Sequence, residues 1–180
     1  MAIEINLTQG KVALIDEADF ELVSGYTWHA KKNKNTFYAQ TNVPREGGGQ
    51  RRILMHRLLL GLIDPTIKTD HRDRNGLNNT RSNLRACTNA ENMRNTGAQA
   101  NNTSGYKGVS WHKQSGKWAA YIKANWKRKH LGLFTTPEAA HAAYCKAALE
   151  LHGEFANFGT PPPKRWAKPS FEIIHTGAQR

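Results

Sequence analysis

The sequence predicts an α+β protein with strand-rich parts on both sides of a short functional segment. Residues 1–53 contain runs in which apolar and polar residues alternate, as half-buried strands do. Residues 106–134 read as three further short strands, and an alanine-rich helical pattern follows them. We therefore expect a β-rich N-terminal module over 1–53, a functional segment over 54–96, and a three-stranded antiparallel sheet packed on one helix.

The N-terminus is expected to form a β-hairpin. Apolar residues alternate over 3–7, a turn follows at 8–11, and 12–15 return as the second strand. Residues 16–23 fit either a short helix or a loop, and their pattern does not decide between the two.

Two aromatic-rich strands follow, at residues 26–30 and 37–40, around a polar turn. An aromatic and lysine-rich hairpin can contact nucleic acid by stacking and by binding phosphates. We favour the simpler interpretation, in which Trp28 and Tyr38 form the core of a small sheet. Residues 45–50, R-E-G-G-G-Q, are expected to be a flexible connector.

Residues 55–62, M-H-R-L-L-L-G-L, predict an apolar helix. Pro65 ends that element, because the residue before a proline avoids the helical region. His56 is a secondary candidate for a metal or phosphate ligand, since a histidine beside a hydrophobic stripe more often has a packing role.

The stretch that follows carries the chemistry. Asp70 and His71 are adjacent, and a strand-like run at 84–88 leads into a helical turn. Three asparagines at a spacing of three share one side of that turn, and spacing alone does not choose among them: Asn89, Asn92 and Asn95. One carboxylate and one amide oxygen can bind a hard divalent cation, which leaves the imidazole free to act as a base. The pattern outlines a metal-dependent phosphodiesterase site.

This pattern resembles the homing-type HNH endonucleases of phages and mobile elements, over roughly residues 54 to 95. The matching parts are M-H-R-L-L, the pair Asp70-His71, Asn83 in S-N-L-R and Asn92 in T-N-A-E-N. The resemblance implies a ββα-metal fold.

The resemblance also implies roles for these residues. Asp70 and Asn92 would hold one divalent ion, Mg²⁺ or Mn²⁺, which polarises the scissile phosphate and stabilises the departing oxygen. His71 would take the proton from the attacking water, and Asn83 would bridge the loop and orient His71. Four arginines are placed to clamp flanking phosphates: Arg72, Arg74, Arg81 and Arg85.

A small, polar linker at 97–103 separates this segment from the second part of the chain. Strands are expected at 106–111, 117–123 and 128–134. The helix that follows should begin with a threonine N-cap before Pro137 and stop at Gly153.

Residues 104–159 resemble the AP2 (ERF-type) DNA-binding domain. The matching motifs, in order, are Y-K-G-V, G-K-W-A-A-Y-I, L-G-L-F, T-P-E-A-A-H-A-A-Y and G-E-F-A-N-F. The resemblance implies a sheet that lies in the major groove of DNA. The groove-facing residues would be Lys107, Ser110, His112, Tyr121, Lys123, Arg128 and His130. Serine, histidine, tyrosine and lysine side chains read bases less specifically than bidentate arginine, so we expect the docking mode of the family but not its base specificity. Trp118, Ala139, Ala143 and Ala147 are expected in the core.

Composition supports a polyanionic partner. The net charge is +12 and the pI is about 10, and such a surface attracts phosphate backbones. Cys87 and Cys145 are far apart, which indicates reduced thiols and not a disulfide or a zinc site. We find no signal peptide and no membrane span, and expect a cytoplasmic protein of a bacterial or phage-infected cell.

The combined hypothesis is a metal-dependent endonuclease, monomeric or dimeric, that an AP2-like domain places on double-stranded DNA and that nicks it or cuts both strands. The main rival is a non-catalytic DNA-binding regulator with a silent HNH fold. An RNA-directed binder fits less well, because the major groove of A-form RNA is too narrow for such a sheet. The basic, proline-rich residues 160–180 are expected to be extended and to add phosphate contacts.

Overall fold

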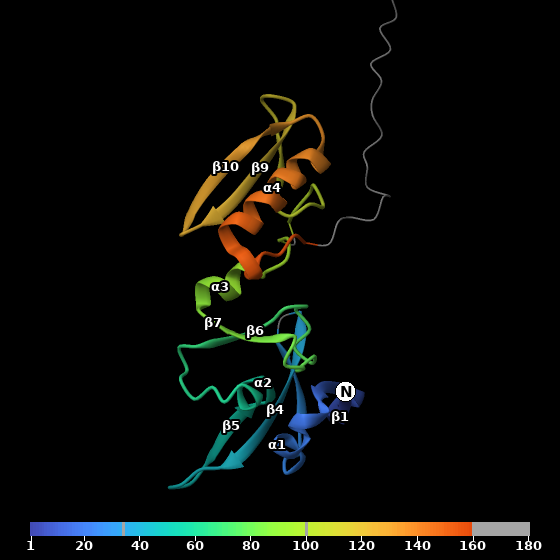
Figure 1. The fold of residues 1–180 in the computed structure, drawn as a ribbon, viewed down its shortest axis with the longest axis vertical. Coiled ribbons are helices and arrows are strands. Elements are labelled where there is room, and N and C mark those ends of the chain that lie inside the picture. Colours follow the sequence, from blue (N-terminus) through green and yellow to red (C-terminus); the bar gives the residue numbers. More distant parts are fainter. Residues whose placement is uncertain (34, 100, 160–180) are drawn as a thin grey trace, which may run out of the picture. The chain divides into compact units, whose positions relative to one another are not determined.

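The computed structural model describes residues 1–33, 35–99 and 101–159. The expected C-terminal tail at 160–180 lies outside the described residues. The described residues form two compact units, drawn in Figure 1: residues 1–96 with 149–157, and residues 97–148 with Phe158 and Gly159. The division differs from the expected boundaries, because 1–53 and 54–96 belong to one unit and 149–157 join it.

The first unit begins with an antiparallel hairpin. Strands β1 (Ala2–Asn6) and β2 (Val12–Asp16) pair as the alternation predicted. A 3-10 turn at Glu17–Asp19 and helix α1 (Phe20–Ser24) follow. The ambiguous segment at 16–23 is therefore mostly helical.

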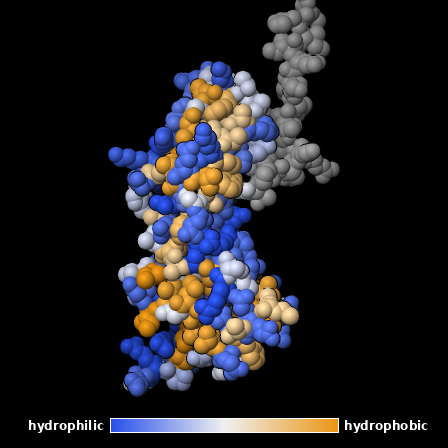
Figure 2. All heavy atoms as spheres, in the orientation of Figure 1, coloured by the Kyte–Doolittle hydropathy of each residue, from blue (hydrophilic) through white to orange (hydrophobic). Residues whose placement is uncertain are grey.

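A three-stranded antiparallel sheet comes next, in the order β3-β4-β5. Its strands are β3 (His29–Asn33), β4 (Thr36–Pro44) and β5 (Gln50–Leu54). Strand β5 was not expected from the sequence, because Q-R-R-I-L alternates poorly and follows three glycines. Those glycines, at positive φ, form the turn between β4 and β5, and Figure 2 shows hydrophilic residues gathered at that free end.

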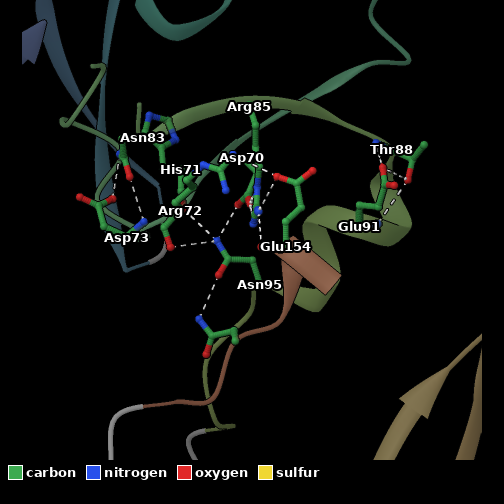
Figure 3. Close-up of polar contacts among 11 residues, drawn as sticks. Asp70, His71, Arg72, Asp73, Asn83, Arg85, Thr88, Glu91, Asn95 and Glu154 are labelled. Carbon is green, nitrogen blue, oxygen red and sulfur yellow. Dashed lines mark hydrogen bonds and ion pairs between the residues drawn. The ribbon is translucent and has the colours of Figure 1, made fainter. Parts of the chain in front are cut away.

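The functional segment contributes one short helix, two paired strands and a second helix. Helix α2 (Met55–Leu59) is three residues shorter than expected, because Gly61 turns the chain with a φ of 63°. Strands β6 (Lys68–His71) and β7 (Leu84–Cys87) are antiparallel. Helix α3 (Asn89–Arg94) follows β7, and a capping box between Thr88 and Glu91 fixes its start (Figure 3).

One hydrophobic core holds this unit together. Its buried members come from the N-terminal elements and from the functional segment alike: Ala13, Ile15, Val23, Trp28, Ala39, Met55, Leu59 and Leu84. The core role expected of Trp28 is confirmed, and its indole nitrogen donates to the Val23 carbonyl at 2.9 Å. Tyr38 is not a core residue, since its ring lies beside His56 and His71. The shared core explains why residues 1–53 and 54–96 form one compact unit.

The second unit is the expected three-stranded antiparallel sheet with one helix. Its strands are β8 (Val109–His112), β9 (Lys117–Ala124) and β10 (Lys127–Phe134), with β9 in the middle. Helix α4 (Pro137–His152) follows. The threonine cap is confirmed, because the Thr136 hydroxyl accepts from the Ala139 amide at 3.2 Å.

The buried stripe of α4 lies one position away from the expected one. Ala140, Tyr144 and Ala148 are buried, together with Ala147, whereas Ala139 is exposed. Residues spaced by four share one helix face, so the stripe starts at Ala140. The core roles expected of Ala147 and Trp118 hold, and Ala143 packs at the core's edge.

Both cysteines are free thiols, as expected. Burial raises the pKa of Cys87 to about 11, so this thiol is unreactive near neutral pH. No helix in the described parts of the chain has the length and apolar character needed to cross a bilayer.

Candidate functional site

His71 ends strand β6 and is 5% exposed. Its Nε2 lies 3.2 Å from the Oδ1 atom of Asn79, which is fully buried. The centroid of the His71 ring lies 5.2 Å from that of His56 and 5.7 Å from that of Tyr38. Asn79 was not singled out from the sequence, where its only signal is its place after the asparagine-glycine turn.

The Asn79 amide fixes which nitrogen of His71 carries the proton. Its Nδ2 donates to the Leu77 carbonyl at 3.2 Å, so its Oδ1 faces His71 and accepts. His71 therefore carries its proton on Nε2, and Nδ1 keeps the lone pair. Burial lowers the pKa of His71, against the opposing effects of the Asn79 hydrogen bond and of the charges on Asp73 and Asp70. The ring is neutral around pH 7.

Asp70 is buried beside His71, and both of its oxygens accept hydrogen bonds (Figure 3). Arg85, its cross-strand neighbour on β7, donates to Oδ2 from Nε at 2.8 Å and also from Nη2. Asn95 donates to Oδ1 from Nδ2 at 2.8 Å. The carboxylate thus forms a structural ion pair in this arrangement.

The helix residue that reaches Asp70 is Asn95, and not Asn92. The Nδ2 group of Asn95 also donates to the His71 carbonyl at 2.8 Å, and its Oδ1 accepts from Asn157 at 3.0 Å. Asn95 acts as a bridge between β6 and the 149–157 segment. Asn92 instead lines a hollow together with Tyr38, His56 and Thr69.

These hydrogen bonds bear on the predicted divalent-ion site. A hard cation needs open oxygen ligands, but a guanidinium occupies one oxygen of Asp70 and an amide donor occupies the other. Among the described residues, the hydrogen bonds to the Asp70 side chain come from Arg85 and Asn95, and none comes from Asn92. The expected pair of ligands therefore does not fit Mg²⁺ or Mn²⁺ as these side chains lie.

Asn83 has the loop-bridging position that was expected. Its Oδ1 accepts from the Asp73 amide at 3.0 Å, and its Nδ2 donates to Asp73 Oδ1 at 3.0 Å and to the Asn78 carbonyl at 2.7 Å. The loop is also tied to strand β2, because Asn79 donates its amide to the Leu14 carbonyl at 2.7 Å. The side chain that holds the His71 ring is Asn79.

The four arginines expected to clamp phosphates differ in their surroundings. Arg85 is buried, with its guanidinium stacked 3.8 Å from the Phe155 ring centroid, so its role is structural. Arg81 chelates the buried carboxylate of Asp19, with Nη2 at 2.6 Å from Oδ1. Arg72 forms an exposed pair with Glu154 at 3.0 Å. Within the described residues, Arg74 is the member of this set with no ion pair.

In the second unit, six of the seven residues expected to face DNA lie on one face of the sheet. The register pairs Tyr121 with His130 and Lys123 with Arg128, and places Ser110 opposite Ala119. Residues at alternate positions point the same way, so one face carries Ser110, His112, Tyr121, Lys123, Arg128 and His130. The other face carries Val109, Ala120 and Ile122, which are buried.

Lys107 does not belong to that face. Its ammonium lies 5.9 Å from the ring centroid of Tyr144, on the helix side of the sheet. Lys117, which pairs with His112, shares the polar face and was not identified from the sequence. Two residues of the polar face also contact each other, because the Arg128 guanidinium stacks 3.7 Å from the Tyr121 ring centroid.

Comparisons with known proteins agree with this description of the second unit. Residues 104–154 match the AP2 domain family, which implies DNA binding. No solved structure matches the chain.

Two viral proteins are similar over most of their own length. Protein 3.8 of Escherichia phage T7 is 34% identical over 109 residues, covering 61% of this chain and 89% of that protein. The protein named uncharacterized HNH endonuclease L560, of Acanthamoeba polyphaga mimivirus, is 31% identical over 149 residues, covering 82% of this chain and 74% of that protein. The fold and the AP2 match define an AP2-domain protein of α+β class. The chain belongs to the family that contains these two viral proteins.

Proposed function

We propose that this protein is an HNH-type endonuclease that its AP2 domain places on double-stranded DNA. The observation that carries the proposal is the state of His71. Its ring is neutral, its proton is held on Nε2 by Asn79, and Nδ1 keeps the lone pair that a general base needs. The name of the mimiviral relative points the same way.

In this proposal the polar face of the second unit binds the duplex, and His71 removes a proton from the water that attacks a phosphodiester. Asn79 positions the ring, and Asn83 holds the loop that carries Asn79. The proposal includes a requirement for Mg²⁺ or Mn²⁺, but it assigns none of these side chains as a ligand of that ion. Nicking and double-strand cleavage are both compatible with a single site of this kind.

A second candidate function is DNA binding without cleavage, as in a regulator. Asp70 favours it, because both of its oxygens are already used by Arg85 and Asn95. The burial of His71 favours it as well, since an attacking water must reach the ring.

The test is incubation of supercoiled plasmid, and of DNA from the native host, with the purified protein and Mg²⁺ or Mn²⁺. We expect relaxed or linear product that disappears with EDTA and with His71→Ala. The matched control is His29→Ala, which removes a half-buried histidine of β3 in the same unit. DNA that is retarded on a native gel but stays intact in every arm would establish the regulator instead.

A further inference from the structure

The first unit contains a basic hollow that the proposed roles above do not use. It has a volume of about 430 Å³ and lies between the sheet β3-β4-β5 and the elements α2, β6 and α3. We call it the basic hollow and define it by Lys31, Tyr38, Arg52, His56, Lys68 and Thr69. The residues of its lining that the structure describes include no carboxylate.

One wall of the basic hollow is the outer face of the sheet. The register pairs Lys31 with Tyr38 and Asn42 with Arg52, so these side chains share one face. Ala39 and Thr41, which alternate with them, are buried on the opposite face. The core therefore forces Lys31 and Arg52 to point towards the hollow.

Two residues of the opposite wall, His56 and Thr69, each carry a buried polar atom that lacks a partner. The Nδ1 atom of His56 and the hydroxyl of Thr69 are buried and have no hydrogen-bond partner among the described residues. His56 as a whole is 7% exposed. A buried polar group without a partner destabilises a fold, and a ligand that reaches it removes that penalty.

The chemistry of the lining selects an anion as the occupant. Lysine and arginine side chains repel a metal ion, and no carboxylate among the described lining residues offsets them. A hydroxyl donates, as does a neutral imidazole with its proton on Nδ1, and phosphate oxygens accept from both. Burial lowers the pKa of His56 to about 3, so the ring enters as a neutral donor.

We propose that the basic hollow seats a phosphate of the duplex DNA backbone, with Lys31, Arg52 and Lys68 supplying charge and Thr69 and His56 supplying donors. The site lies beside His71, whose ring is 5.2 Å from that of His56. A phosphate held there would fix the position of the duplex on the unit that carries His71. The inference rests on the proposed DNA binding and does not require cleavage.

The experiment uses the full chain and a short fluorescent duplex of mixed sequence, with binding measured by anisotropy over a range of salt concentrations. Every phosphate that a variant no longer neutralises reduces the slope of log K against log salt by about 0.9. Because Lys31 and Arg52 face the same phosphate, we expect a smaller slope for Arg52→Gln and for Lys31→Gln, and a reduction of up to about 0.9 when both are replaced. The matched control is Arg51→Gln, the adjacent arginine of β5, which pairs with Val43 and lies on the other face.

A second variant tests the donors without changing charge. Thr69→Val removes a hydroxyl at nearly constant shape, so we expect about tenfold weaker binding with an unchanged salt slope. Wild-type affinity for Thr69→Val, or equal slopes for Arg51→Gln and Arg52→Gln, would overturn the proposal.

A last arm separates DNA from free phosphate. Inorganic phosphate is titrated alone while the ring nitrogens of His56 are followed by NMR. A shift of His56 together with wild-type DNA slopes in the variants would assign the hollow to a small phosphate and overturn the assignment to DNA. If the plasmid is not cleaved, the proposed nuclease activity is contradicted. The salt slopes still test the phosphate site, because they measure DNA binding and not cleavage.

Discussion

Asp70 and Arg85 form a buried ion pair across strands β6 and β7, with Nε 2.8 Å from Oδ2. Asn95 donates a hydrogen bond to the Asp70 carboxylate of this pair. Phe155, in the 149–157 segment, stacks on the Arg85 guanidinium. The residue that the family resemblance marks as a metal ligand is therefore also a main support of the first unit.

Removing one partner of this pair should destabilise the first unit strongly. Arg85→Met leaves the Asp70 carboxylate buried and uncompensated, for which we expect a decrease of about 3 to 5 kcal/mol in the free energy of unfolding. The measurement is urea denaturation. Arg72→Met is the control, because its pair with Glu154 is exposed and contributes less than about 1 kcal/mol. Equal decreases for the two variants would show that Arg85 has no special role.

The ion pair also shows what sequence reasoning could and could not reach. The D-H pair and its strand were evident from residue types, because an imidazole and a carboxylate at a strand end suggest chemistry. The partner of Asp70 was not evident, since it depends on the register of β6 with β7 and on a segment more than sixty residues later. Asn92 and Asn95 share one side of a helical turn, and only tertiary packing selects the one that reaches Asp70.

More of the second unit could be predicted, because its elements are determined by residues close together in the sequence. A threonine before proline marks the start of α4, and alternation marks the strands, so sheet, helix and polar face follow from short-range patterns. Lys107 was misplaced because it precedes β8, where alternation does not apply. Strand β5 was missed because its own residues do not alternate clearly between apolar and polar. Its pairing with β4, which is not visible in the sequence, is what makes it a strand.

His71 and Asn79 should be energetically coupled. Asn79→Ala leaves the Nε2–H group of His71 without a partner and removes one of two hydrogen bonds to the Leu77 carbonyl, which keeps the one from the Leu14 amide. We expect a decrease of about 1 to 3 kcal/mol in stability. A double-mutant cycle with His71→Ala should give a coupling of at least about 0.5 kcal/mol. Additive effects in urea denaturation would mean that the hydrogen bond contributes nothing.

His56 should make the stability depend on pH. Burial, together with the nearby His71 and Arg57, lowers its pKa from the ordinary 6.5 to about 3. Below pH 6.5 the unfolded chain binds a proton that the folded chain excludes, so stability is complete above pH 6.5 and falls as the pH approaches 3. The slope contributed is at most about 1.4 kcal/mol per pH unit.

The check is denaturant unfolding at several pH values between 4 and 7.5 on the wild type and on His56→Gln. We expect the variant to lose part of the slope. His29→Gln, which removes a half-buried histidine of the same unit, serves as the control. A wild-type slope in His56→Gln would contradict the prediction.

Gly108 should be essential for the second unit. Its φ is 77°, and an added Cβ would lie 2.2 Å from the Tyr144 ring. Gly108→Ala combines an unfavourable backbone with overpacking, for which we expect a decrease of about 3 kcal/mol or more in stability. Gly116→Ala is the matched control, since its φ is 61° but nothing lies within 4 Å of the added atom. Thermal unfolding and DNA binding of both variants are the measurements, and similar behaviour would exclude the clash with Tyr144.

The polar face of the second unit should carry its phosphate contacts. Arg128 pairs with Lys123 on that face, whereas Lys129 pairs with Ile122, which is buried towards the helix. Neutralising Arg128 should therefore reduce the salt slope of duplex binding by about 0.9, and Lys129→Gln should leave it unchanged. The two residues are adjacent and exposed, so a general effect of net charge would change both slopes equally. Only an unequal result supports binding through the face that carries Tyr121 and His130.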